Sequence, residues 1–229
     1  MGGISQFASG TRAGYGGPDQ KPRVLGVLSS LLQRMVDVND KCAIVHDTDR
    51  VRTATTTKMQ DWFTVFHGRS APPISIEEYV ERIFKYANCS PSCFVVAYAY
   101  LDRIIHQPAG GIPITSLNVH RLLITSVMVA AKFLDDSFYN NAYYGKVGGV
   151  STQEINRLEL EFLFGIGFRL HVSLQEFDCY CSRLERELIS FDMERALTVP
   201  STAYDESPGQ RVQPSSASSY QQIILESVS

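Results

Sequence analysis

Two oppositely charged residues, Lys132 and Glu159, stand inside strongly apolar stretches of the sequence. The Lys132 ammonium can only donate hydrogen bonds, and the Glu159 carboxylate can only accept them. If both side chains point the same way from neighbouring helices, Lys132 would bind carbonyl oxygens and Glu159 would bind N–H groups of a foreign helix. The alternative is that they pair with each other or with solvent, and their spacing leaves both possibilities open.

A second charged pair is expected to be structural. Asp102 and Arg103 end an apolar run, and Arg82 precedes that run. We expect Arg82 to be the partner of Asp102, because a salt bridge between two core helices satisfies both charges. This pair would tie the helices together rather than bind a ligand.

No recognised catalytic or ligand motif is present. The pair Gly145 and Lys146 lacks both the glycine five residues earlier and the following Ser or Thr of a phosphate-binding loop. The five cysteines and five histidines lack zinc-site spacing. We therefore predict no catalytic residue, no cofactor and no metal, with a helical enzyme of unrecognised type as an alternative.

Composition narrows the class of partner. The chain has 229 residues and a formal net charge of -3, without a basic stripe, which argues against binding nucleic acid through its phosphates. No apolar run approaches the roughly 18 residues of a membrane span. No secretory signal precedes the cysteines, so we expect reduced thiols and an intracellular protein of the nucleus or the cytoplasm.

A buried helix hairpin is predicted over residues 90–136, and its second helix carries Lys132. Ser90 and Pro91 are typical of a helix start. Residues 93–101 are all apolar or aromatic, so no face of the first helix is left for solvent. Prolines and glycines at 108–113 form a turn, and the second helix is expected to begin at Thr115 or Ser116.

Three Ser-x-x-Glu boxes predict three further helix starts, at residues 75–78, 151–154 and 173–176. An apolar stripe of helical period follows each box, and Glu159 lies on the helix after the second one. A short helix is expected near residues 139–144, before Gly145, Gly148 and Gly149 interrupt it.

The predicted fold is all-α, with one domain of five core helices and an extra leading helix. The expected segments are a disordered N-terminus (1–22), a leading amphipathic helix (23–40), a linker (41–61), the main domain (62–190) and a flexible tail (191–229). In that tail, Ser207 before Pro208 is a candidate for proline-directed phosphorylation.

Several short segments resemble the signatures of the cyclin box: residues 100–103 (Tyr-Leu-Asp-Arg), 130–133 (Ala-Ala-Lys-Phe) with Asp135 and Asp136, and 157–159 (Arg-Leu-Glu). Residues 79–86, 89–94, 118–123 and 141–149 are most similar to plant U-type (P-type) cyclins, which resemble the fungal cyclin of phosphate signalling. The resemblance extends from about residue 62 to residue 188.

The resemblance implies a single five-helix cyclin box over residues 62–190 and a non-catalytic subunit in a heterodimer with a cyclin-dependent protein kinase. In that family the lysine and glutamate matching Lys132 and Glu159 bind the mobile helix that decides kinase activity. Apolar contacts to the kinase are expected from Val129, Phe133, Leu163 and Phe168. The complex would link cell division to growth or nutrient state. The alternative function is a cyclin-fold transcription adaptor that contacts DNA-bound factors.

Overall fold

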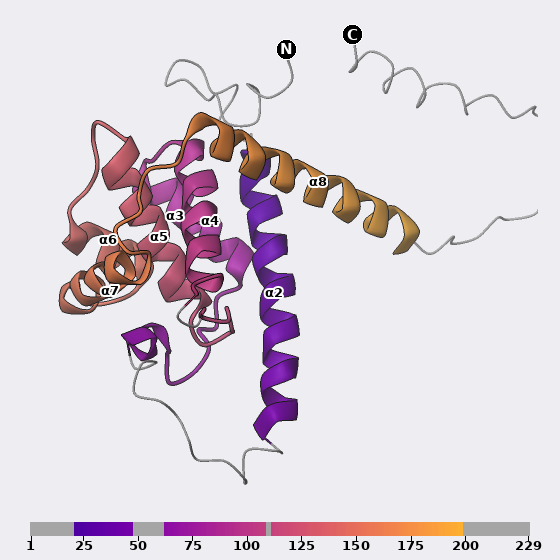
Figure 1. The fold of residues 1–229 in the computed structure, drawn as a ribbon, viewed down its shortest axis with the longest axis horizontal. Helices are drawn as coiled ribbons and strands as arrows, with labels where there is room; N and C mark the ends of the chain where they lie inside the picture. The colour runs from indigo at the N-terminus through magenta and orange to yellow at the C-terminus, as the bar shows by residue number, and fades with distance from the viewer. Residues whose placement is uncertain (1–20, 48–61, 109–110, 199–229) are drawn as a thin grey trace, which may run out of the picture.

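The computed structural model describes residues 21–47, 62–108 and 111–198, and within these ranges every regular secondary-structure element is a helix (Figure 1). The predicted all-α fold is therefore confirmed. The elements in chain order are α2 (Arg23–Asp47), the 3₁₀ helix η1 (Trp62–Phe66), α3 (Ile76–Ala87), α4 (Pro91–Ile105), α5 (Val119–Leu134), α6 (Asn141–Gly148), α7 (Thr152–Gly165) and α8 (Leu174–Thr198). None of the described helices combines the length and apolar character that a membrane span requires.

The centre of the fold is the predicted hairpin of α4 and α5. Every side chain over residues 93–101 and 122–131 is buried, which confirms that both helices lie inside the bundle. The buried hydroxyl of Thr125 donates to the Arg121 carbonyl at 2.7 Å, so it is satisfied within its own helix. α5 begins later than predicted, at Val119, because Asn118 closes a separate turn by accepting from the Thr115 N–H at 2.8 Å.

Two of the three capping boxes form in full. Ser75 accepts from the Glu78 N–H at 3.2 Å, and the Glu78 carboxylate accepts from the Ser75 N–H at 3.1 Å. This hydrogen bond from the Ser75 backbone also lowers the pKa of Glu78. Ser173 and Glu176 at the start of α8 repeat the arrangement. In α7 only the hydroxyl of Ser151 caps the helix, since the carboxylate of Glu154 bonds Arg121 instead.

The short helix α6 continues through two of the glycines that were expected to interrupt it. A Cβ added at Gly145 would lie 2.9 Å from the Val150 carbonyl oxygen, and one at Gly148 would lie 2.9 Å from Ile124. These glycines allow close packing. The helix ends only at Gly149, whose φ of 73° is a left-handed conformation that favours glycine.

The outer helices extend past the predicted segment boundaries. α2 packs along α4 and continues to Asp47, so residues 41–47 of the expected linker are helical. α8 crosses one end of α2, then projects from the bundle as far as Thr198, past the expected domain boundary at residue 190 (Figure 1). The rest of the predicted linker, the tail beyond residue 198 with Ser207, and residues 1–20 lie outside the described residues.

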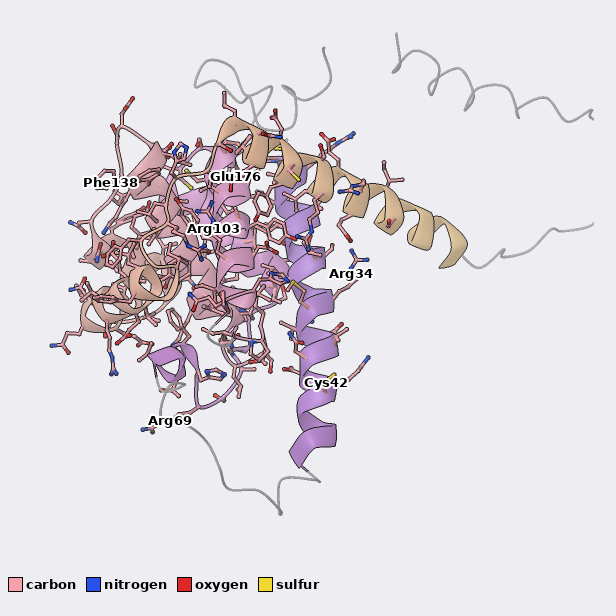
Figure 2. All side chains as sticks on the ribbon, viewed as in Figure 1. Arg34, Cys42, Arg69, Arg103, Phe138 and Glu176 are labelled. Atoms are coloured by element: carbon pink, nitrogen blue, oxygen red, sulfur yellow. The ribbon has the colours of Figure 1, made fainter. Side chains whose placement is uncertain are left out.

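The predicted pair of Arg82 and Asp102 is wrong. Asp102 accepts from the Tyr180 hydroxyl and the Arg183 guanidinium of α8, each at 3.1 Å. Arg82 donates to the Lys146 carbonyl at 3.2 Å. At the same end of α4, Arg103 forms an ion pair of 3.5 Å with Glu176, and both are labelled in Figure 2. The charges that close α4 thus fasten it to α8, not to α3.

Candidate partner-binding site

Two helices carry the charged residues singled out by the sequence. Lys132 lies in the last turn of α5, where the partial negative charge of a helix C-terminus stabilises a cation. Glu159 lies in the middle of α7, whose start is fixed by the Ser151 cap. α5 and α7 pack against each other in the bundle. Side chains from two segments far apart in the sequence therefore meet at one place.

Lys132, Asn141 and Glu159 form a closed hydrogen-bonded network. The Lys132 Nζ lies 2.6 Å from Glu159 Oε1 and 2.5 Å from Asn141 Oδ1. The Asn141 amide then donates to Glu159 Oε2 at 2.7 Å and to Asn156 Oδ1 at 2.8 Å. Asn141, the first residue of α6, therefore holds the carboxylate and the ammonium side by side. In the unbound chain the two charges pair with each other, one of the two arrangements left open by the sequence.

The network is open enough to exchange partners. The side chains of Lys132 and Glu159 are 25% and 18% exposed. Two of the three ammonium hydrogens of Lys132 have partners within the described residues, and a carboxylate has about four acceptor sites, of which two are used here. Each group can therefore take a further hydrogen bond from a molecule that docks on this surface.

Exposed apolar side chains accompany the network on both helices. Phe133 follows Lys132 and is exposed, as is Phe168 beyond the end of α7, while Leu163 is partly buried against the core. Val129 is only 3% exposed and belongs to the core, so it offers no surface to a partner in this structure. Leu160 and Phe164 were not among the predicted contact residues, yet they are more exposed than Leu163 on the same helix. The signal that could have found them was their apolar type at positions off the core stripe.

The backbone after α7 holds Phe168 in an uncommon conformation. Gly167, with φ 60°, ends the helix in a Schellman motif, in which the Phe168 N–H donates to the Leu163 carbonyl at 2.9 Å. Phe168 itself has φ 54°, a left-handed value that costs a non-glycine residue energy. Its ring packs edge-to-face against Phe164 with centroids 5.2 Å apart. The strained turn thus brings the exposed ring of Phe168 against the exposed ring of Phe164 at the end of α7.

The described residues contain no group of three His, Cys, Asp or Glu that could hold a metal ion. All five cysteines are free thiols. Burial raises the pKa of Cys181 to about 11, which keeps that thiol protonated. The site therefore contains a lysine–glutamate pair that can bind both carbonyl and N–H groups of a main chain, with aromatic side chains around it.

The family model and the relatives that match this chain all indicate the same protein family. The family model described as Cyclin matches residues 23–170. The chain is 55% identical over 186 residues to Cyclin-U4-1 of Arabidopsis thaliana, covering 81% of this chain and 86% of that protein. It is 49% identical over 176 residues to Cyclin-P3-1 of Oryza sativa subsp. japonica, covering 77% and 69%, and 48% identical over 180 residues to Cyclin-P4-1 of the same species, covering 78% and 80%.

Proposed function

The chain belongs to the cyclin family, and from that premise we propose that it is the non-catalytic regulatory subunit of a cyclin-dependent protein kinase. The observation that carries the proposal is the pairing of Lys132 with Glu159 on a partly exposed surface between α5 and α7. That surface can bind carbonyl and N–H groups at the same time, which suits the main chain of another protein.

The proposed mechanism is selective binding of one kinase conformation. Protein kinases need a lysine–glutamate ion pair, the glutamate supplied by a mobile helix, to position metal-bound ATP. A subunit that binds only the inward position of this helix shifts the population toward the active state. It can do so without contributing any group to the chemical step.

The structure suggests how the grip would form. On docking, the Lys132 ammonium would turn from Glu159 toward a carbonyl of the kinase helix, and the Glu159 carboxylate would accept from an N–H group. Asn141 can keep one bond to each of them during this exchange, because its amide carries both an acceptor and donors. Phe133, Phe164 and Phe168 would cover the apolar side of the same helix.

The first prediction is that Lys132→Ala and Glu159→Ala each weaken kinase binding. Removing one partner of a desolvated charged contact costs about 2 to 5 kcal/mol, so the dissociation constant should rise roughly 30-fold or more. The unbound fold should lose about 1 kcal/mol or less, because the pair is partly exposed. Calorimetric titration of each variant against a panel of purified cyclin-dependent kinases, with activity measured in parallel, provides the measurement.

Lys85→Ala and Glu161→Ala are matched controls. Lys85 is exposed on α3, and Glu161 lies two positions beyond Glu159, near the opposite side of α7. If Lys132→Ala and Glu159→Ala bind a cognate kinase as tightly as the controls do, the proposed grip is wrong. If no kinase in the panel is bound or activated by the wild-type chain, the regulatory role itself is wrong.

We also propose that the complex acts inside the cell, in the nucleus or the cytoplasm, and links division to growth or nutrient state. The similarity to plant U-type and P-type cyclins supports this proposal. Phosphate starvation of plants that express a tagged protein should change the kinase activity recovered with it. Unchanged activity would contradict nutrient control without affecting the proposal of kinase binding. A salt-dependent gel shift with DNA would favour the alternative of a transcription adaptor.

A further inference from the structure

A second surface feature lies at the opposite end of α5 from Lys132. The first turns of α5 and α7, together with η1 and the loop after it, enclose an open hollow of about 760 Å³. The polar side chains that line it include three arginines, Arg69, Arg121 and Arg157, and one carboxylate, Glu154. The hollow is therefore strongly basic, in contrast with the formal charge of -3 on the whole chain.

The single carboxylate is already engaged. The Arg121 Nε donates to Glu154 Oε1 at 2.7 Å, which neutralises one positive and one negative charge. Neither Arg69 nor Arg157 has a carboxylate partner among the residues that the structure describes, and both are exposed. An anion can therefore bind the exposed guanidinium groups of Arg69 and Arg157. It can also accept from the N–H groups of Arg121 that do not bond Glu154.

The arginine inside the hollow is paired with Glu154 and lies close against the loop after η1. A Cβ added at Gly68 would come within 2.7 Å of Arg121 Nη1, so only a glycine lets the guanidinium lie this close to the loop backbone. The Gly68 N–H donates to the Leu117 carbonyl at 2.7 Å and fixes the loop to the segment before α5. A positioned guanidinium loses less conformational freedom on binding than a mobile one.

The start of α7 adds to the positive potential. Ser151 and Gln153 line the hollow, and the Ser151 hydroxyl caps only the Glu154 N–H, at 3.0 Å. The N–H groups of the preceding two residues of the helix have no intrahelical acceptor, as at any helix start. The helix dipole favours an anion near these N–H groups.

We propose that this hollow binds a phosphoserine or phosphothreonine carried by an extended protein segment. A phosphate monoester brings a charge of about -1.5 to -2 and three acceptor oxygens, which match several guanidinium donors better than one carboxylate does. The volume of the hollow, about 760 Å³, is much larger than that of a phosphate group, so residues on either side of the phosphate can also lie in it. Val65 and Leu158, which line the same hollow, provide apolar contacts for those residues.

The phosphate site and the kinase-binding site use different faces of the same helices. Successive residues of an α-helix turn by about 100°, so Arg157 and Glu159 on α7 lie about 200° apart. Arg121 precedes Lys132 on α5 by eleven positions, about 16 Å along the axis. In Figure 2, Arg69 lies near the bottom of the view, well away from Phe138, which follows the end of α5.

The test is binding of a fluorescent nonapeptide of Gly and Ser with one central phosphothreonine, measured by anisotropy with the full chain. The phosphopeptide should bind at least tenfold more tightly than the same peptide with unmodified threonine. The double variant Arg69→Gln with Arg157→Gln should abolish that difference, since both side chains are exposed and the fold should remain intact. Arg186→Gln, exposed on α8, is the matched control and should bind as wild type does.

Two further arms separate the sources of phosphate. Inorganic phosphate should compete only at concentrations far above that of the phosphopeptide; equal potency of the two would show a site for the free ion and overturn the peptide proposal. Equal binding of the threonine and phosphothreonine peptides, or undiminished phosphopeptide binding by the double variant, would also overturn it. Kinase titration of the same double variant distinguishes this outcome from failure of the grip by Lys132 and Glu159.

Discussion

Asn141 is the residue that turns an ion pair into a positioned site. It bonds both members of the pair, at 2.5 Å and 2.7 Å, and is held in turn by Asn156. Asn141→Ala removes these hydrogen bonds and leaves the charges in place. Because one such bond contributes about 1 kcal/mol, we expect kinase affinity to fall roughly fivefold, less than for Lys132→Ala. Calorimetric titration of Asn141→Ala against the kinase checks the effect. Asn140→Ala, which removes only a helix cap, is the control.

His120 makes the stability of the fold depend on pH. Its Nε2 lies 3.0 Å from the Ile74 carbonyl oxygen, while its Nδ1 is buried without a hydrogen-bond partner among the described residues. Burial, with a smaller effect of Arg121, lowers the pKa of His120 from its ordinary 6.5. The unfolded chain therefore binds a proton more readily than the native one. We therefore expect the contribution of neutral His120 to stability to be complete above about pH 6.5 and to fall as the pH decreases below it.

The measurement is the free energy of unfolding in urea at pH 7.5 and pH 5.5. One proton contributes a slope of at most about 1.4 kcal/mol per pH unit. In His120→Gln, whose amide can still donate to the Ile74 carbonyl, this part of the slope should disappear. His171→Gln, an exposed control on the segment before α8, should retain it. Equal slopes for all three proteins would exclude His120 as the source.

The sequence predicted those site residues that can be recognised by their residue type alone. Lys132 and Glu159 could be singled out because charges are rare inside apolar helices. Asn141 could not, since nothing in its local sequence indicates that α6 begins beside both charges. The partner of Asp102 was missed for the same reason: Arg183 lies 81 positions away on α8, and only the folded chain brings it near.

α6 and α2 contain glycines with opposite requirements. At Gly148 a Cβ would lie 2.9 Å from Ile124, whereas at Gly26 a Cβ would meet nothing within 4 Å. Gly148→Ala should therefore destabilise the fold by about 1 to 3 kcal/mol, because α6 must move away from α5. Gly26→Ala should stabilise it by about 0.5 to 1 kcal/mol, because alanine is the better helix former. Urea denaturation of both variants compares them, and a shift of the same sign in both would contradict the prediction.

Helix starts were predicted better than helix ends. Ser75, Ser151 and Ser173 each cap a helix in the structure, because a capping box is a local signal. α2 extends past its predicted end at residue 40, and α8 extends past the predicted domain boundary at residue 190, because nothing in the sequence stops either helix there. Gly145 and Gly148 were taken for breaks, although their role is set by neighbours from other segments.

The leading helix α2 shares one hydrophobic core with the rest of the bundle. Six apolar side chains of α2 are buried at 4% exposure or less, and they pack with residues of α3 and α4: Val24, Leu25, Val27, Leu28, Leu32 and Val36. The amphipathic period predicted this helix, but not that it completes the core. The bundle and α2 should therefore unfold together.

Leu28→Ala tests this coupling. The side chain is fully buried, so its truncation should cost about 2 to 5 kcal/mol. Hydrogen exchange of amides in α4 should accelerate in parallel, since global unfolding exposes them. Val38→Ala, on an exposed position of the same helix, should change stability by only about 0.5 kcal/mol. Unchanged protection of α4 in Leu28→Ala would show that α2 detaches independently.

The mutual contact of Lys132 and Glu159 also has a kinetic consequence. At a distance the two charges cancel, so this part of the surface exerts almost no long-range attraction on an approaching molecule. Association there should be governed by shape and by the aromatic rings, with a rate that changes little with ionic strength. A ligand with charge of only one sign should bind weakly here. It would pair with either Lys132 or Glu159 and leave the other without its present partner. The surface therefore discriminates in favour of uncharged ligands rich in both donors and acceptors, as a polypeptide main chain is.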